Sequence, residues 1–355
     1  MSSREIVSAM FSVMGWDLGG ANLKLARIEG RRAVAVAQIP CPLRQDASKF
    51  DAALAEALPL CPIGAVHAVT MTGELSDVFA SRADGVAYLV EMMRKVTDGE
   101  AIFYGGRAGF LQDIGAVEHM NDVASANWHA SANLIGRSLP EALLIDAGTT
   151  TTDIVPITDG GVAAKGYTDA ERLAEGELVY SGVVRTPVMA VARTAPFKGR
   201  MQGVAAERFA TMADVWRLLG TLQAGADPYP TPDLQGKSTQ ESAVRLARML
   251  GRDAAPTDLL AYVDVARHFA ERQRGEIEAA ALKLIGREGL ADDAPIVGAG
   301  CGRFVARQIA ERLGRPYRDF VELVDCAPQA RDMAASCAPA VAVGLLAAHE
   351  LVLDA

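Results

Sequence analysis

The chain of 355 residues is poor in cysteine, in basic residues and in long apolar runs, and each shortage argues against a class of protein. Its five cysteines show no CxxC spacing and none are close enough in sequence for a metal knuckle, so we expect reduced thiols. Thirty-five basic residues stand against 44 acidic ones, and the resulting net charge of −9 argues against a general nucleic-acid surface.

No uncharged run of 18 or more apolar residues occurs, which argues against a membrane-spanning helix. The N-terminus carries Arg4 and Glu5 before a short apolar stretch, residues 7–15, and this is not the pattern of a signal peptide. We therefore expect a cytoplasmic protein with no membrane and no nucleic-acid partner. A homo-oligomer is compatible with the sequence.

Half of the residues are hydrophobic, and the length predicts two domains or one domain with a large insertion. Apolar runs alternate with helical stretches, which is typical of an α/β protein with a mixed sheet. We expect two strands around a glycine turn in 11–39, further strands at 65–71, 101–104, 142–145 and 154–157, and a strand from 294 into 302. Helices are expected over 50–58, 84–97, 121–135, 304–313 and 334–353.

Two aspartate-led turns lie about 130 residues apart, Asp17-Leu-Gly-Gly-Ala-Asn-Leu-Lys24 and Asp146-Ala-Gly-Thr-Thr-Thr-Thr-Asp153, and each follows a short apolar run. In such a turn the backbone N–H groups can approach a phosphate while the carboxylate holds hydrated Mg²⁺. Two such turns facing one another would grip a polyphosphate from both sides. Because strand, acidic turn and strand occur twice, we predict an internal duplication of topology.

The two turns differ in how strongly they point to phosphate. The first turn also fits a hairpin with a capping aspartate. The second carries four consecutive threonines, whose hydroxyl and N–H groups form a dense donor array, although a β-rich structural turn is the alternative. A third cluster, Gly298-Ala-Gly-Cys-Gly302, lies between a strand and a helix and fits either an anion or close packing.

The order of these three segments resembles the two phosphate motifs and the adenosine motif of the actin-like ATPase superfamily. The resemblance implies an α/β fold with two RNase H-like lobes around a central cleft and a mostly helical insertion. The first lobe would comprise residues 11–140 plus 335–355. The second would comprise 141–334, with the insertion at about 165–290.

Six further segments make a closer resemblance that covers nearly the whole chain: 15–22, 70–77, 126–131, 146–156, 175–182 and 209–216. They resemble hydantoinase/oxoprolinase-related proteins of tetrahydromethanopterin-linked one-carbon pathways, including members that act in methanofuran biosynthesis. This resemblance implies a transferase that joins an aminomethyl-furanylmethyl diphosphate to the phenol oxygen of a γ-glutamyl-tyramine or tyrosine-type acceptor. An ether forms and pyrophosphate leaves, without ATP.

On this interpretation the residues fall into four groups. Asp17 and Asp146 hold Mg²⁺, while the diphosphate contacts come from Gly19, Gly20, Asn22, Lys24, Gly148, Thr149, Thr150, Thr151 and Thr152, with Gly298, Gly300 and Gly302 as a further wall. A phenol with a pKa of about 10 needs a base or a cation to attack at neutral pH. The catalytic candidates are His129, Asp153, Glu74 and Lys24, and the acceptor candidates are Trp128, Glu177, Tyr180 and Arg185.

Each of these residues also has a structural interpretation. His129 and Trp128 fit hydrogen-bonded packing, Lys24 fits a solvated strand position, and the segment 175–185 fits a solvated loop and cap. Two other functions stay open. One is an ATP-dependent small-molecule kinase or hydantoinase/oxoprolinase-like hydrolase with adenosine at 298–302 and Asp146 or Asp153 as base. The other is a nucleotide-switched regulator without enzymatic activity.

Overall fold

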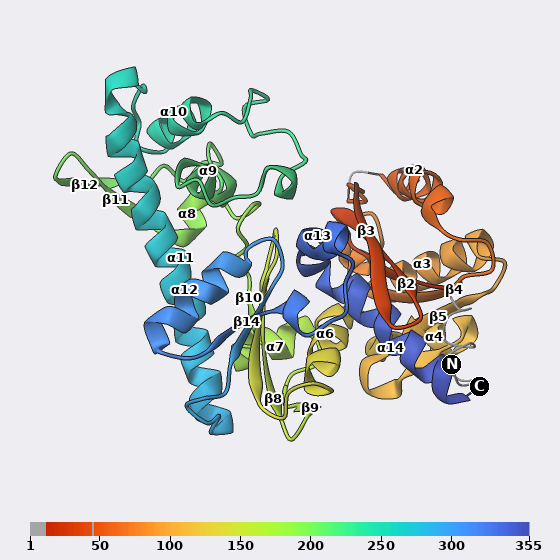
Figure 1. Cartoon of the computed structure of the whole chain (residues 1–355). Coiled ribbons are helices and arrows are strands. Elements are labelled where there is room, and N and C mark those ends of the chain that lie inside the picture. Colours follow the sequence, from red (N-terminus) through yellow and green to blue (C-terminus); the bar gives the residue numbers. More distant parts are fainter. Residues whose placement is uncertain (1–11, 45, 355) are drawn as a thin grey trace. The chain divides into compact units, whose positions relative to one another are not determined.

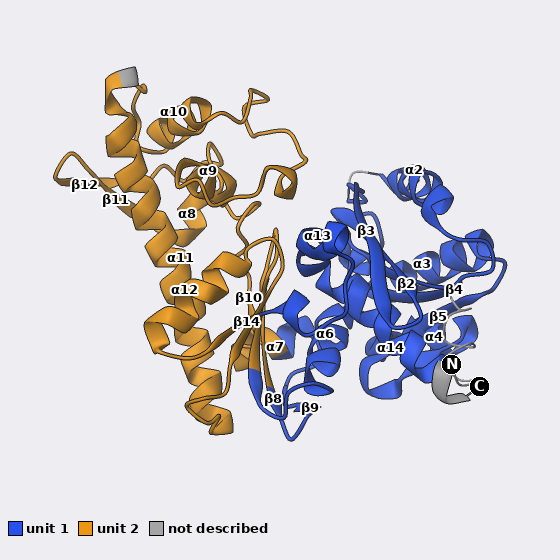
Figure 2. Cartoon of the chain, viewed as in Figure 1, with its two compact units in different colours: residues 1–142, 157–171, 319–355 blue, residues 143–156, 172–318 orange. Residues whose placement is uncertain are grey.

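The computed structural model describes residues 12–44 and 46–354 (Figure 1). It divides into two compact units (Figure 2), of which unit 1 comprises residues 1–142, 157–171 and 319–355 and unit 2 comprises 143–156 and 172–318. Residues 157–171 and 319–334, which the sequence predicts in the second lobe, thus cluster with unit 1. Most of the apolar N-terminal stretch at 7–15, together with Arg4 and Glu5, lies outside the described residues.

Unit 1 is built on a six-stranded sheet in the order β3-β2-β1-β4-β5-β6. Its central strand β1 runs antiparallel to β2 and parallel to β4. The strands are β1 (Ser12–Leu18), β2 (Asn22–Glu29), β3 (Arg32–Pro40), β4 (Val66–Met71), β5 (Ala101–Tyr104) and β6 (Phe110–Leu111). The helices are α2 (Ser48–Ala57), α3 (Arg82–Val96), α4 (Asp113–Glu118), α5 (Met120–Val123), α6 (Asn127–Gly136), α13 (Arg331–Ser336) and α14 (Ala338–Asp354).

Alternation along β1 decides which helices cover which face of this sheet. Met14, Trp16 and Leu18 belong to one buried cluster with residues of α2 and α3. Gly15 faces the other way, where a Cβ would overlap the backbone of Ala340 and Gly344 in α14. Glycine at both positions therefore lets helix and strand approach backbone to backbone.

Unit 2 contains a second sheet in the order β10-β8-β7-β13-β14, with β9 paired to β8, and a separate hairpin of β11 and β12. The strands are β7 (Ala142–Ala147), β8 (Thr152–Thr158), β9 (Gly161–Val162), β10 (Leu178–Val179), β11 (Thr194–Phe197), β12 (Arg200–Gly203), β13 (Ile296–Ala299) and β14 (Tyr317–Asp319). The helices are α7 (Asp169–Glu175), α8 (Val188–Val191), α9 (Met212–Leu218), α10 (Thr239–Met249), α11 (Leu259–Glu288) and α12 (Arg303–Leu313). By residue range β9 belongs to unit 1, and β8, β14 and α7 each contain residues of both units.

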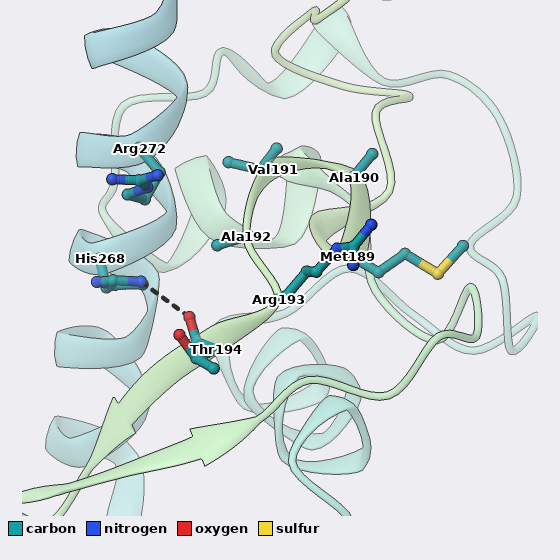
Figure 3. A pocket seen from close by; sticks show the side chains of 8 residues that line it. All are labelled: Met189, Ala190, Val191, Ala192, Arg193, Thr194, His268 and Arg272. Carbon is teal, nitrogen blue, oxygen red and sulfur yellow. Dashed lines mark hydrogen bonds between the residues drawn. The ribbon is translucent and has the colours of Figure 1, made fainter.

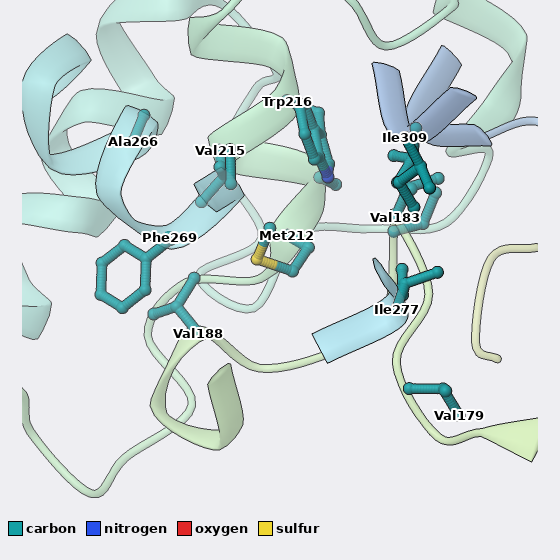
Figure 4. Close-up of a cluster of buried hydrophobic side chains, with 14 of the residues drawn as sticks. Val179, Val183, Val188, Met212, Val215, Trp216, Ala266, Phe269, Ile277 and Ile309 are labelled. Carbon is teal, nitrogen blue, oxygen red and sulfur yellow. The ribbon is translucent and has the colours of Figure 1, made fainter. Parts of the chain in front are cut away.

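The long helix α11 organises the part of unit 2 outside its sheet. One side of the helix borders a cavity of about 610 Å³ next to α8 and the start of β11 (Figure 3). Another side carries Phe269 and Ile277 into an apolar cluster with Trp216 and Met212 of α9 (Figure 4). The segment 165–290 is mostly helical, as predicted, and it also contains the short strands β10, β11 and β12.

The two large sheets repeat one topology. Five strands of the second sheet, in the order β10-β8-β7-β13-β14, take the places of β3-β2-β1-β4-β5 in the first sheet. The central pair is parallel in both sheets, β1 with β4 in the first and β7 with β13 in the second. This confirms the internal duplication that the two aspartate turns predict.

Two predicted helices are each divided in the structure. The helix expected over 121–135 breaks where Ser125 adopts a positive φ of 53°, between α5 and α6. The closing helix expected over 334–353 is divided at Cys337 into α13 and α14. Among the described residues no single helix is long and apolar enough to cross a membrane; the segments 328–336 and 338–351, bent by 111°, meet that test only together.

Candidate phosphate-binding turns

The first aspartate turn is a tight link between β1 and β2 in unit 1. The Gly19 N–H donates to the Asn22 carbonyl at 3.1 Å, and the Leu18 carbonyl accepts from the Thr72 N–H at 3.0 Å. A Cβ on Gly19 would lie 2.7 Å from the Asn22 oxygen, so a larger residue does not fit. The N–H groups of Gly20 and Ala21 have no acceptor among the residues the structure describes. The turn thus offers two backbone donors.

Asp17 occupies the centre of a row of three polar side chains across the sheet. Its register partners are Lys24 on β2 and Thr70 on β4. The Lys24 ammonium lies 3.3 Å from Asp17 Oδ2, and only 2% of the Asp17 side chain is exposed. The structure therefore brings together three of the predicted residues, Asp17, Lys24 and Asn22, and adds Thr70.

The second aspartate turn repeats the first in unit 2. The Gly148 N–H donates to the Thr151 carbonyl at 2.9 Å, which is the same three-residue closure as Gly19 to Asn22. Each residue of the second turn lies 129 positions after its counterpart in the first turn, so that Asp146 corresponds to Asp17 and Asp153 to Lys24. Two stretches of different sequence therefore adopt the same turn closure.

The threonine loop of this second turn exposes a run of backbone donors. In the described part of the chain, no acceptor is found for the N–H groups of Thr149, Thr150 and Thr151. Two hydrogen bonds to the segment 181–185 fix the loop: the Thr149 carbonyl accepts from the Arg185 N–H at 2.8 Å, and the Thr152 hydroxyl donates to the Ser181 carbonyl at 2.7 Å. Successive free N–H groups on a fixed loop form an anion-binding concavity.

The third glycine cluster packs against the second turn. Ala299 of β13 is the register partner of Asp146, and Gly300 follows with a φ of 81°. A Cβ on Gly300 would overlap Asp146 Oδ1 and the Ala147 carbonyl oxygen. Gly302 donates its N–H to the same Ala147 carbonyl at 2.8 Å, while Gly298 is crowded by the Tyr317 ring. Close packing therefore explains all three glycines, and it places Gly300 at the Asp146 carboxylate.

Asp153 is half-buried and forms an ion pair with a buried arginine. Its Oδ1 lies 2.7 Å from Arg172 Nη1, and the Arg172 side chain is 1% exposed and also donates to the Glu177 carbonyl at 2.9 Å. Asp153 holds the sequence position that corresponds to Lys24 of the first turn. A carboxylate bound to a buried guanidinium is a poor base, so a structural role for Asp153 fits this geometry better than catalysis.

His129 belongs to an aromatic cluster in unit 1. Its Nδ1 lies 2.9 Å from the Tyr104 hydroxyl, which also accepts a hydrogen bond from the Asn133 amide at 2.9 Å. The Trp128 and Tyr167 rings pack edge to face, with their centroids 5.8 Å apart. Burial raises the pKa of Tyr104 to about 12, so this hydroxyl keeps its proton. Trp128 is buried, and core packing explains it.

Glu74 is a buried carboxyl group on the turn after β4. It is 1% exposed and accepts a hydrogen bond from the Ser125 hydroxyl at 2.7 Å. Burial raises the pKa of Glu74, while the Ser125 bond opposes this shift. The raised pKa favours the protonated carboxyl, which is an acid rather than a base.

The acceptor candidates of unit 2 separate into different environments. Glu177 is fully buried and lies 2.7 Å from Arg287 Nη2, so it is part of an internal ion pair. Tyr180 is 65% exposed. The Arg185 guanidinium reaches the Thr150 hydroxyl at 3.4 Å, which places it beside the threonine loop. Arg185 therefore lies with the threonine loop and not with Glu177 or Tyr180.

A magnesium ion fits the donor set of these turns. Among the described residues no group of three or more His, Cys, Asp or Glu side chains is placed to hold a metal. Mg²⁺, however, usually takes one or two carboxylates and completes its shell with water and substrate phosphates. Within residues 12–44 and 46–354, two buried oxygens near Asp17 find no hydrogen-bond partner: Asn22 Oδ1 of the first turn and Thr70 Oγ1 of β4. Asp17 and these oxygens are suitable ligands, and Asp146 is the equivalent carboxylate in unit 2.

Several residues of the site do not stand out in the sequence. They are Thr70, Tyr104, Ser125, Arg172 and Gln273, whose amide holds the Ser181 hydroxyl and the Gly182 carbonyl, both at 2.9 Å. Thr70 lies within the segment 70–77 that carries the family resemblance, and Ser125 directly precedes the segment 126–131, so the sequence offers a local signal for these two residues. The partners of Arg172 and Gln273 are distant in sequence, and nothing local marks them.

The repeated sheets and their paired turns define the class of protein: the chain has the actin-like ATPase fold. A solved acetone carboxylase, in nucleotide-free form, is similar with a TM-score of 0.57 and 12% identity, over 94% of this chain and 70% of that one. At this identity the likeness concerns the fold alone.

The family follows from the sequence comparisons. The hydantoinase/oxoprolinase family model matches residues 65–321, and the chain belongs to this family. A protein of Methanocaldococcus jannaschii is 31% identical over 68% of this chain and 72% of its own length. A protein of Methanococcus vannielii is 37% identical over 31% of this chain and 50% of its own length. Both are named (4-{4-[2-(γ-L-glutamylamino)ethyl]phenoxymethyl}furan-2-yl)methanamine synthase.

Proposed function

We propose that this chain is a transferase of methanofuran biosynthesis that forms the ether between a furanylmethyl group and a phenol. The phenol oxygen of a γ-glutamyl-tyramine or tyrosine-type acceptor attacks the methylene carbon of an aminomethyl-furanylmethyl diphosphate. The carbon–oxygen bond to the diphosphate breaks, pyrophosphate leaves with the bonding electrons, and the phenol proton passes to a base.

The observation that carries this proposal is the 31% identity to a named synthase over 68% of the chain. The compound in that protein's name contains a phenoxymethyl-furan ether and a glutamylaminoethyl arm. An enzyme that makes this compound can do so by alkylating a phenol. The relatives are enzymes by name, and the chain is an enzyme of the same family.

The threonine loop supplies the physical basis for diphosphate departure. Three adjacent N–H groups at Thr149–Thr151 are oriented by fixed backbone contacts, and Arg185 lies beside them. Preorganised donors stabilise the charge that develops on a leaving group more than they stabilise the ground state. Mg²⁺ bound at Asp146 would neutralise part of the diphosphate charge. The Asp17 turn offers the same kind of donors in unit 1.

His129 is the candidate base for the phenol proton. The tautomer of its neutral ring decides whether Nε2 can accept that proton. If Nδ1–H donates to Tyr104, the other ring nitrogen, Nε2, can accept a proton. If Tyr104 donates to Nδ1, then Nε2 already carries the proton of the neutral ring and cannot act as base. Replacing Tyr104 by Phe therefore separates the two cases: activity falls in the first and is retained or rises in the second.

The direct test is turnover without nucleotide. Purified protein, Mg²⁺, the furanylmethyl diphosphate and γ-glutamyl-tyramine or tyrosine are incubated without ATP, and the ether and pyrophosphate are followed by mass spectrometry. We expect equal amounts of both products and their loss on chelation of Mg²⁺ with EDTA. No ether without ATP would overturn the proposal, and ATP hydrolysis by the same preparation would favour the kinase or hydrolase alternative.

Matched aspartate variants locate the chemistry. Asp146→Asn removes the carboxylate beside Gly300 and should lower kcat by at least about 100-fold, as expected for a lost electrostatic contact at a leaving group. Asp292→Asn serves as the control, because Asp292 is fully exposed on unit 2. Full activity of the Asp146 variant would remove that residue from the site.

A further inference from the structure

Gln273 of α11 carries a buried polar side chain within the apolar part of unit 2. The residue is 0% exposed, and Phe269 and Ile277, one turn away on either side along the helix, belong to the apolar cluster. A buried amide costs free energy unless its hydrogen bonds are formed, whereas a leucine or methionine would pack here without that cost. A glutamine at this position therefore points to a role that an apolar side chain cannot fill.

The contacts of the Gln273 amide fix its orientation from both ends. Its Oε1 accepts a hydrogen bond from the Trp216 indole at 2.8 Å, and its Nε2 donates to the Ser181 hydroxyl and to the Gly182 carbonyl, both at 2.9 Å. An indole N–H can only donate and a carbonyl can only accept, so the amide cannot be turned over without losing both contacts. Joining Trp216 to Gly182 requires an acceptor at one end and a donor at the other.

The segment 181–185, which Gln273 holds, is in direct contact with the threonine loop. It lies outside the helices and strands, and its Arg185 N–H donates to the Thr149 carbonyl at 2.8 Å. Gly182 approaches the loop more closely still, because a Cβ at this residue would lie 2.5 Å from the Thr150 nitrogen. A shift of this segment would therefore move the backbone N–H groups of the loop.

We propose that Gln273 is a positioning residue for diphosphate binding. Acting through Ser181 and Gly182, its amide holds the segment 181–185 against the threonine loop, so that the N–H groups of Thr149–Thr151 keep the arrangement that an anion needs. The inference rests on the diphosphate role proposed for this loop. It adds that the affinity for pyrophosphate depends on a hydrogen-bond donor at Gln273.

Binding of inorganic pyrophosphate in the presence of Mg²⁺, measured by calorimetry, tests this role without turnover. Gln273→Met has a similar volume but no hydrogen-bonding group, and we expect it to weaken binding by about tenfold, because the buried partners of the amide lose their bonds. Leu246→Ala, in α10, is the matched control: it removes buried apolar packing from unit 2 but no hydrogen bond, so it should lower stability and leave the affinity unchanged. Unaltered affinity in Gln273→Met, or an equal loss in both variants, would overturn the proposal.

Gln273→Glu separates the donor from the packing. Its carboxyl group, when protonated, can accept from Trp216 and donate to Gly182, whereas the ionised group can only accept. Burial favours the protonated form, so at about pH 5.5 the variant should bind pyrophosphate as tightly as the parent protein does at that pH. Trp216, Ser181 and Gly182 do not titrate, so any weakening at higher pH belongs to the introduced carboxyl. A tenfold loss that persists at about pH 5.5 would overturn the proposal, because a donor has then been supplied without effect.

The binding measurements also keep this inference distinguishable from the transferase assignment. If the parent protein binds no pyrophosphate, the positioning role falls together with the phosphate role of the loop. If pyrophosphate binds and the variants behave as expected but no ether forms, only the transferase assignment is overturned.

Discussion

His67 makes unit 1 sensitive to acid. Its imidazole is 8% exposed and accepts a hydrogen bond from the Trp16 indole, Nε1 to Nδ1 at 3.0 Å. Burial lowers the pKa of His67 from 6.5 to about 4. The unfolded chain therefore binds a proton more tightly than the folded one. The stability associated with the neutral ring is fully present above pH 6.5 and is lost as the pH falls towards 4.

The magnitude follows from the gap between these two pKa values. At about 1.4 kcal/mol for each pH unit, the interval from 6.5 to about 4 corresponds to roughly 3 kcal/mol in the free energy of unfolding. About 2 kcal/mol of this is lost by roughly pH 5, because the folded protein is still almost unprotonated there. Such a loss is a large part of the stability of an ordinary domain.

The assay compares the protein with His67→Asn, which keeps an oxygen that can accept the Trp16 N–H but does not titrate. Hydrogen exchange of peptides from β1 and β4 at pH 7.5 and pH 5, corrected for intrinsic rates, reports on unit 1 alone, which matters because two units need not unfold together. We expect the protein to lose roughly 2 kcal/mol more than the variant. An equal loss in both, or a folded His67 pKa near 6.5 by NMR, would refute the reasoning.

Three further predictions concern the turns. Gly300→Ala should lower the free energy of unfolding by roughly 2 kcal/mol or more, because alanine is strained at a φ of 81° and its Cβ would overlap Asp146. Gly286→Ala, in α11 with open space around it, should instead raise it by roughly 0.5 to 1 kcal/mol in the same denaturant titration. Arg172→Met leaves the partly buried Asp153 carboxylate without its ion-pair partner and should cost roughly 2 to 3 kcal/mol, so an unchanged midpoint would contradict the ion pair. Glu74→Gln should become relatively more stable than the parent as the pH rises above 4.5, because the raised pKa of Glu74 penalises its ionised form; a pH-independent difference in melting temperature would oppose this.

The sequence predicts the strands and turns around the two aspartates because their signals are local. A short apolar run, an aspartate and small residues mark the end of a strand, and the same pattern twice predicts the repeated topology. Where helices break is less visible: at Ser125 the break depends on a positive φ and a hydrogen bond to Glu74, which lies 51 residues away in sequence.

The roles of individual charged residues depend on contacts between distant segments. The local sequence indicates that Glu177 is a polar residue in a loop. In the structure its ion-pair partner is Arg287, 110 positions further along the chain. Asp153 belongs to a motif that suggests catalysis, and Arg172, 19 positions away, gives it a structural partner. Such pairings are fixed by tertiary packing, and local sequence patterns do not encode them.

The contact between α14 and β1 also governs when unit 1 can complete its fold during synthesis. Gly15 belongs to the first described strand and Gly344 to the last described helix, so the ribosome must make every residue between them before they meet. The contiguous stretch 172–318 of unit 2, together with 143–156, is available earlier. Domains usually fold in the order of their synthesis. We expect the reverse order in this protein, with the face of β1 that receives α14 in need of protection until α14 has been made.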